Sequence, residues 1–145
     1  MKLGVIGSPI EHSKSPEIHT NFADQFDLEL VFEKYLVSKN ECLEWVKSFF
    51  ESGGLGLSVT LPLKEVVLEI ADDISLRAKQ AAAANMLFLK DGKIFADCTD
   101  GLGLVTDLKT KEIDIADKKI LILGAGGAAK GIVPSLLNEN PEQVI

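Results

Sequence analysis

The stretch Ile120-Leu121-Ile122-Leu123-Gly124-Ala125-Gly126-Gly127-Ala128-Ala129 decides the fold class of this 145-residue chain. Its four apolar residues predict a short strand, and the Gly-x-Gly-x-x-Ala turn after them opens a predicted helix. Glycines at these spacings permit a tight turn, a close backbone approach to a pyrophosphate and close packing of helix on strand. The pattern favours a dinucleotide-binding turn, and an ordinary glycine-rich turn is the alternative.

Upstream of that stretch, short apolar runs alternate with segments in which apolar residues recur at helical spacing. The expected strands are residues 3–6, 30–37, 55–59, 86–89, 94–96, 119–123 and 143–145. The expected helices are residues 18–26, 43–50, 64–71, 76–84, 101–109 and 127–137. Pro62 is expected to start the third helix and Ser75 to cap the fourth. The Asp91-Gly92 pair predicts an antiparallel hairpin.

Residues 110–118 are polar, charged and short of large side chains, and we expect the domain boundary there. The alternation of strands and helices with short connections predicts an α/β fold. Residues 1–110 are expected to form a domain with a mostly parallel sheet flanked by helices. Residues 119–145 are then the first β-α-β part of a Rossmann-type domain, which is incomplete within this chain.

The composition is that of a globular protein, with 46% hydrophobic and 26% charged residues. A net charge of −7 and the lack of a basic run argue against nucleic acid as a partner. The apolar runs are too short for a signal peptide or a membrane span, so we expect a cytoplasmic protein. Cys42 and Cys98 are expected to be reduced thiols, and no His/Cys spacing indicates a metal site.

Residues 7–19 lead from an apolar run into a predicted helix. They place the hydroxyls of Ser13 and Ser15 at a helix start, where the backbone favours an anion. Capping of the helix ahead of Pro16 is the alternative for both serines. We interpret His12 and His19 as residues that orient this loop or pack beside it, rather than as acid/base groups.

Three further polar residues are candidates for chemistry, and each has an ordinary structural alternative. Lys64 lies just inside a predicted helix, where a cation is unfavourable, and a solvated surface lysine is its alternative. Asp100 precedes Gly101 at another helix start, so N-capping is its alternative. For Asn85 the alternative is a turn-forming asparagine. Residue chemistry alone leaves these alternatives open.

Taken together, these segments and the glycine-rich turn resemble the shikimate dehydrogenase family over essentially the whole chain. The resemblance implies that Lys64 and Asp100 are the catalytic residues. It implies that the substrate is bound by Ser13, Ser15, Ser58, Thr60, Asn85 and Thr99. It also implies that the cofactor is bound by Gly124, Ala125, Gly126, Gly127, Ala128 and Ala129.

The activity implied by the resemblance is the reduction of 3-dehydroshikimate to shikimate with NADPH, a step towards the aromatic amino acids. NADP over NAD rests on the resemblance alone, because the residue that reads the ribose 2′ position lies beyond this chain. The assembly is left open between a monomer and a homodimer.

Three departures from the family pattern leave the substrate open. The family usually has Asn, Thr and Asn at the positions of Ser58, Met86 and Cys98. A paralogue that acts on quinate or a related hydroxy acid is therefore one alternative. A substrate-binding fragment without turnover is another, and we expect the 145-residue chain alone to be weak or inactive.

Overall fold

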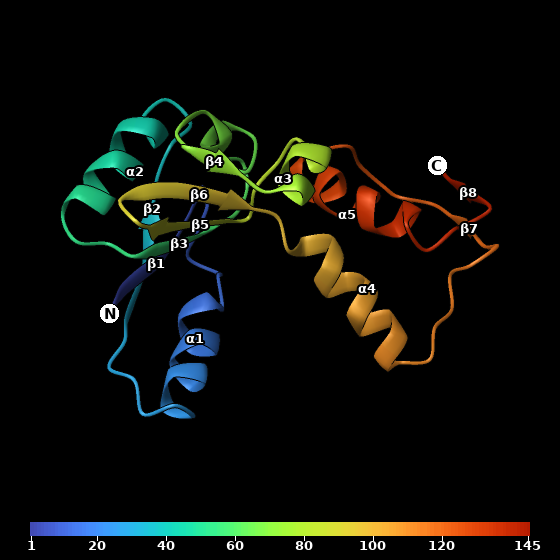
Figure 1. The fold of residues 1–145 in the computed structure, drawn as a ribbon, viewed down its shortest axis with the longest axis horizontal. Coiled ribbons are helices and arrows are strands. Elements are labelled where there is room, and N and C mark those ends of the chain that lie inside the picture. Colours follow the sequence, from blue (N-terminus) through green and yellow to red (C-terminus); the bar gives the residue numbers. More distant parts are fainter.

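A computed structural model describes residues 1–145 as two lobes of unequal size that are joined through α4 and the segment after it (Figure 1). The strands are β1 (Lys2–Gly7), β2 (Val31–Leu36), β3 (Gly56–Val59), β4 (Asp73–Ile74), β5 (Met86–Lys90), β6 (Lys93–Asp97), β7 (Lys119–Ile120) and β8 (Gln143–Val144). The helices are α1 (Ser15–Asp24), α2 (Cys42–Glu51), the 3-10 helix η1 (Val66–Glu69), α3 (Leu76–Ala81), α4 (Asp100–Thr110) and α5 (Gly127–Leu137).

The large lobe is built on a six-stranded sheet in the order β2-β1-β3-β5-β6-β4. Strand β1 runs parallel to β2 and to β3, and β4 runs parallel to β6, whereas β5 is antiparallel to both of its neighbours. The expected α/β fold is therefore confirmed, and the sheet is mixed, because β5 pairs antiparallel with both β3 and β6. Because β1, β3 and β6 run in one direction, the residues that follow Gly7, Val59 and Asp97 emerge at the same edge of the sheet.

The main hydrophobic core lies on one face of this sheet, under α2, η1 and α3. Helix α2 contributes Cys42, Val46, Phe49 and Phe50, which recur at helical spacing and are all buried. Helix α1 lies on the opposite side of the sheet (Figure 1) and covers it only in part, since Phe22 is 53% exposed. The sheet face beside α1 is therefore accessible near the edge where the chain ends of β1, β3 and β6 meet.

The expected hairpin is confirmed by the antiparallel pairing of β5 with β6. Its two turn residues, Asp91 and Gly92, both have positive φ, at 51° and 75°. A two-residue turn of this conformation matches the twist of the strands that it joins, which is why Asp-Gly favours it.

Two of the expected helices differ from the structure. The helix predicted over residues 64–71 is a 3-10 turn confined to η1, because the carbonyl of Lys64 accepts from Ala84 N at 2.7 Å instead of supporting a helical ladder. Pro62 therefore lies in a turn and not at a helix start. The cap predicted at Ser75 is confirmed, since its hydroxyl accepts from Ala78 N, but α3 ends at Ala81 because Ala82 is left-handed, with φ of 48°.

Strand limits and pairings were less well predicted. The short strand β4 was not expected from the sequence at all. The strand predicted over residues 119–123 is confined to β7, because only β8 lies beside it as a parallel partner. Phe26, which was expected to lie within α1, follows the end of that helix.

The small lobe consists of α5 with β7 and β8, and α4 packs along α5 (Figure 1). This contact is close, because a Cβ added at Gly101 would lie 2.9 Å from the carbonyl oxygen of Gly131. No helix or strand is formed between α4 and β7, the segment that was expected to carry the domain boundary. None of the helices is both long and apolar enough to cross a bilayer.

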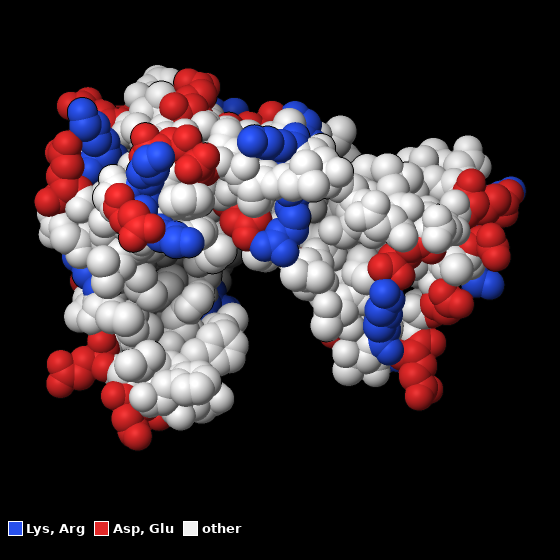
Figure 2. Space-filling view, viewed as in Figure 1, with Lys and Arg blue, Asp and Glu red and all other residues white.

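Charged side chains of both signs are interspersed over the outer surface of the large lobe (Figure 2). The same view shows a deep notch between the two lobes, whose lower walls are mainly uncharged. This face has no broad positive surface and the net charge is −7, so we expect an anionic ligand to be held by local donors instead of long-range attraction.

Candidate active site

A lysine–aspartate pair lies at the edge of the sheet where β1, β3 and β6 end. Lys64 Nζ donates to Asp100 Oδ2 at 2.6 Å, and the two side chains are only 13% and 23% exposed. Lys64 follows β3, and Asp100 is the first residue of α4. The structure disfavours the alternatives considered for them, a solvated surface lysine and an N-cap aspartate. Lys64 is not a solvated surface lysine, and the Asp100 carboxylate bonds to side chains instead of capping α4.

Asn85 holds the other side of this aspartate. Its Nδ2 group donates to Asp100 Oδ1 at 2.9 Å and to Thr99 Oγ1 at 3.0 Å, while its Oδ1 accepts from Thr99 N at 2.9 Å. Both amide protons of Asn85 are thus engaged within the protein. The side chain orients Thr99 and Asp100, which is more than the turn-forming role that was its alternative.

The pair lines a polar pocket of about 400 Å³ that opens between α1 and the sheet edge. Of the eight residues predicted for catalysis and substrate binding, seven line it: Ser13, Ser15, Ser58, Thr60, Lys64, Asn85 and Asp100. Thr99 is outside the lining and is connected to it through Asn85. Four segments distant in sequence, around Ser13, Thr60, Asn85 and Asp100, are therefore brought together as the family resemblance implied.

The two serines form a local unit at the start of α1. Ser13 Oγ donates to Ser15 Oγ at 3.2 Å and accepts from Ser15 N at 3.3 Å. Neither serine is the N-cap residue, which is Lys14 without a side-chain cap bond. Both hydroxyls line the pocket, and because Ser13 donates its proton to Ser15, it is the Ser15 hydroxyl that offers a donor to an anionic group at this helix start.

The two histidines differ in their surroundings. His12 lines the polar pocket beside the serines. His19 packs away from it, with its ring stacked on Phe32 at 4.5 Å and edge-on to Phe22. Burial lowers the pKa of His19, which is consistent with the packing role that was predicted for it.

The glycine-rich turn faces the same region from the small lobe. Gly126, Gly127 and Ala128 line a second hollow, of about 270 Å³, together with Thr60 and Lys64. A Cβ at Gly127 would lie 3.1 Å from Lys64 Cβ, which is tighter than an ordinary contact, so this close approach favours glycine. A third hollow contains Gly124, Ala125 and Ala129.

The geometry of this turn fits the pyrophosphate part of a dinucleotide. Gly124 has φ of 116°, a conformation open to glycine. Added Cβ atoms at Gly124 and Gly126 would enter open space at the start of α5, where a side chain would fill the approach to its free N–H groups. The chain described does not include the residues of a second half that would flank the nicotinamide.

One ion pair links the two lobes directly. Lys130 of α5 donates to Glu65 Oε2 at 2.6 Å, and this contact holds the pKa of Glu65 below its usual value. Because Glu65 adjoins Lys64 and Lys130 follows the glycine-rich turn, the pair joins the two parts of the site.

Two buried residues lie beside the site, Asp97 and Cys98. Sequence reasoning assigned no role to Asp97 and noted Cys98 only as a reduced thiol and a departure from the family pattern. Cys98 Sγ lies 4.0 Å from Asp100 Oδ2 and 3.8 Å from the carbonyl oxygen of Gly131, and burial raises the pKa of its thiol. Cys42 is likewise a free buried thiol, and burial raises its pKa to about 11. The signal available in the sequence was the charge of Asp97 at the end of a strand that is otherwise apolar.

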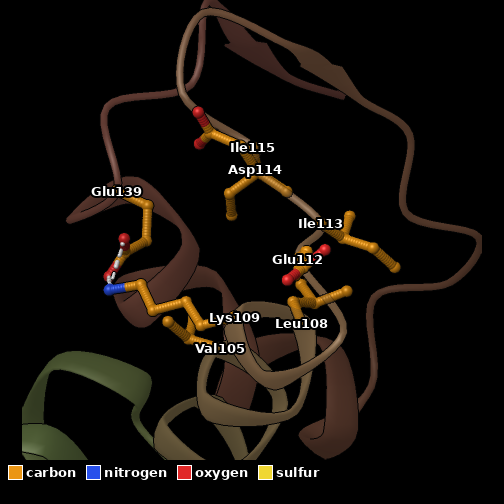
Figure 3. Close-up of a pocket in the computed structure, with 8 residues that line it drawn as sticks. All are labelled: Val105, Leu108, Lys109, Glu112, Ile113, Asp114, Ile115 and Glu139. Atoms are coloured by element: carbon orange, nitrogen blue, oxygen red, sulfur yellow. Dashed lines mark hydrogen bonds and ion pairs between the residues drawn. The ribbon is translucent and has the colours of Figure 1, made fainter.

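Another cavity, of about 220 Å³, lies between α4, the segment that follows it and the end of α5 (Figure 3). Lys109 and Glu139 form an ion pair at 2.8 Å across its wall. It contains none of the residues predicted for catalysis or binding. No cluster of three or more His, Cys, Asp or Glu side chains is arranged to hold a metal ion.

An α/β sheet whose strand ends meet a lysine–aspartate pair, facing a glycine-rich turn, is typical of two-lobed α/β proteins that bind ligands at the carboxyl ends of their strands. Comparison with known proteins agrees. The profile of the shikimate dehydrogenase substrate binding domain matches residues 5–87. The shikimate dehydrogenase (NADP(+)) of Colwellia psychrerythraea is 46% identical over 141 residues, which is 97% of this chain and 51% of that protein.

Solved structures show the same relation. A shikimate dehydrogenase from Peptoclostridium difficile superposes with a TM-score of 0.93 at 29% identity, covering 99% of this chain and 53% of that one. The enzyme from Thermus thermophilus in complex with shikimate gives a TM-score of 0.92 at 29% identity, covering 99% and 55%. This chain belongs to the shikimate dehydrogenase family. It spans about half the length of the relatives that it matches.

Proposed function

We propose that this chain carries the substrate site and catalytic residues of an oxidoreductase that reduces 3-dehydroshikimate to shikimate with NADPH. The observation that carries the proposal is the 2.6 Å contact of Lys64 Nζ with Asp100 Oδ2 on the wall of a polar pocket that also holds Ser13 and Ser15. The shikimate complex of the Thermus thermophilus relative and the NADP(+) in the name of the Colwellia relative support it.

The polar groups of the pocket suit a small hydroxylated acid. In the proposal, the hydroxyls of Ser13 and Ser15 hold the carboxylate at the start of α1. Ser58 and Thr60 bond to ring hydroxyls, while Asn85 and Thr99 complete the polar wall around Asp100. These neutral donors and acceptors orient the substrate relative to Lys64.

Lys64 and Asp100 handle the proton in this proposal. The Lys64 ammonium donates a hydrogen bond to the substrate oxygen and supplies the proton that the oxygen needs when it becomes a hydroxyl. Asp100 keeps the Lys64 amine in place and accepts from the adjacent hydroxyl. The nicotinamide cofactor, when bound, supplies the hydride. Gly124, Ala125, Gly126, Gly127, Ala128 and Ala129 hold its pyrophosphate.

In the proposal, each lobe has a different function. We assign residues 1–110 to substrate binding and catalysis, and residues 119–145 to the beginning of the dinucleotide-binding domain. Packing of α4 on α5 and the Lys130–Glu65 pair support a fixed relation between these two parts.

Calorimetric titration of the chain with shikimate tests the proposal. We expect saturable binding at one site that is lost in Asp100→Ala. A control variant, Lys111→Ala, removes an exposed ion pair with Asp107 and is expected to bind shikimate as the parent does. Binding that survives Asp100→Ala unchanged would contradict the assignment of this pocket.

One observation favours a related substrate as the second candidate. Ser58 lies directly opposite Met86 across β3 and β5, and both residues also line an apolar hollow of about 160 Å³ beneath α1. Ser58 therefore borders both the polar pocket and that hollow, and its short side chain suits a hydroxy acid of different shape, such as quinate. Competition of quinate against shikimate in the same titration distinguishes the two, since the preferred acid displaces the other.

A further inference from the structure

Asp97 is the only charged residue among the buried residues of this protein, at 8% exposure. Its Oδ1 accepts from Ser75 Oγ at 2.6 Å, from Cys98 N at 2.8 Å and from Arg77 Nε at 3.0 Å. Its Oδ2 accepts from Arg77 Nη2. The carboxylate therefore ties the last residue of β6 to the N-terminus of α3.

This arrangement extends to the residues around the lysine–aspartate pair. The backbone carbonyl of Asp97 accepts from Asn85 N at 3.0 Å, and the Asn85 side chain in turn binds Thr99 and Asp100. Asp97 and Asp100 are separated by only two residues, at the corner where β6 becomes α4. Asp97 is thus connected to Asp100 by two routes, through the chain and through Asn85.

Stability alone gives little reason for a carboxylate at this position. A buried ion pair loses the hydration of both charges, and well-packed apolar side chains are often as stable or more so. What an apolar side chain cannot do is accept four hydrogen bonds from fixed directions. The network links the end of β6 to the start of α3, and Arg77 holds the pKa of Asp97 below its usual value so that it remains an acceptor.

We propose that Asp97, braced by Arg77, is a positioning residue that holds Asn85 and Asp100 in the geometry required by Lys64. The inference rests on the proposed function of the Lys64–Asp100 pair. Asp97 does not line the polar pocket, so its effect reaches the substrate only through Asn85, Thr99 and Asp100.

The test compares Asp97→Ala with Asp72→Ala in the full chain. Asp72 is a matched control, because its Oδ2 accepts from Ile94 N at 2.8 Å and so braces the same strand β6 far from the pair. Two measurements are made on each variant: hydrogen exchange of the Asn85 side-chain amide by NMR, and shikimate affinity by calorimetry. Thermal unfolding confirms that each variant is folded.

We expect Asp97→Ala to accelerate Asn85 exchange and weaken shikimate binding by about tenfold each, the effect of one lost charge-assisted hydrogen bond. Arg77→Lys should show a smaller change in the same direction, and Asp72→Ala should change neither. Unchanged Asn85 exchange in folded Asp97→Ala, or in Arg77→Lys if the former does not fold, overturns the inference. If the parent chain binds no shikimate, the proposed function fails, whereas the exchange measurement still decides the role of Asp97.

Discussion

Lys64 Nζ lies 2.6 Å from Asp100 Oδ2, although 36 positions separate the two residues in the chain. The contact joins the loop after β3 to the start of α4, and Asn85 holds the other oxygen of the same carboxylate. Asp100 therefore has one oxygen directed at the amine and one fixed to the protein. This arrangement can keep an amine oriented while a substrate oxygen approaches it.

The first prediction concerns this pair in a form that carries a complete cofactor half. Lys64→Ala should lower kcat by roughly 10²–10⁴, the range usual for loss of a general acid/base. Asp100→Asn should affect both kcat and KM, because Asp100 bonds to Lys64 and is proposed to accept from a substrate hydroxyl. Steady-state kinetics with shikimate and NADP measure both. A Lys64→Ala variant within about twofold of the parent kcat would show that Lys64 has no part in proton transfer.

The second prediction concerns the anion site at α1. Replacing Ser13 and Ser15 together by Ala should weaken shikimate binding by on the order of 1.5–3 kcal/mol for each charge-assisted hydrogen bond lost. The unfolding midpoint should change little, because neither hydroxyl caps the helix. Calorimetry measures the affinity. Ser52→Ala is the control, since Ser52 bonds to Phe49 O far from the pocket, and equal affinity in the double variant and this control would exclude the serines as anchors.

A third prediction follows from the packing of α4 on α5. Gly101→Ala places a Cβ 2.7 Å from Ser135 Cβ and 2.9 Å from Gly131 O, so overpacking should lower the free energy of unfolding by about 1–3 kcal/mol. Gly103→Ala on the same helix meets nothing within 4 Å and should be neutral or stabilising by up to about 1 kcal/mol. Urea denaturation compares the two, and an equal effect would mean that α4 does not pack tightly on α5 in solution.

The fourth prediction concerns acid stability. Arg77 and Ser75 hold the pKa of Asp97 below its usual value, so folding favours the charged form. The resulting stabilisation is complete above the unfolded pKa of about 3.9 and is lost as the pH falls through the lower folded pKa. As the pH falls from about 4 to the folded pKa, the free energy of unfolding should therefore decrease less in Asp97→Asn than in the parent. Urea titrations across this range measure it, and parallel curves for parent and variant would contradict the assignment.

The fifth prediction concerns the small lobe. Leu121 and Leu123 are 68% and 90% exposed, which leaves apolar surface around β7 uncovered. The 145-residue chain should therefore self-associate. It should also show no efficient turnover with shikimate and NADP. Sedimentation should show that Leu123→Lys reduces association more than Leu36→Lys, an equally apolar exposed site on β2. Turnover of about 1–10³ s⁻¹ from this chain would contradict the activity prediction.

Local signals were sufficient for much of the fold. The strand, glycine-rich turn and helix around Gly124 and Gly127 follow from steric demands that act within a few residues. The Asp91-Gly92 hairpin and the Ser75 cap are of the same kind. The hairpin, the cap and the helix after Gly126 are confirmed, whereas the strand before Gly124 is limited to Lys119–Ile120. Motif resemblance also placed together seven residues that line one pocket.

The sequence by itself therefore determined the α/β class, the family and the residues gathered at the sheet edge, because each depends on short-range pattern or on recognisable motifs. Only the tertiary structure decided which atoms meet. The carbonyl of Lys64 accepts a hydrogen bond from Ala84 N, which limits the length of η1. The carboxylate of Asp97, at the end of β6, accepts from Arg77 in α3. Such partners are selected by the packing of α3 against β6, and no local propensity specifies a contact between segments that are distant in the chain.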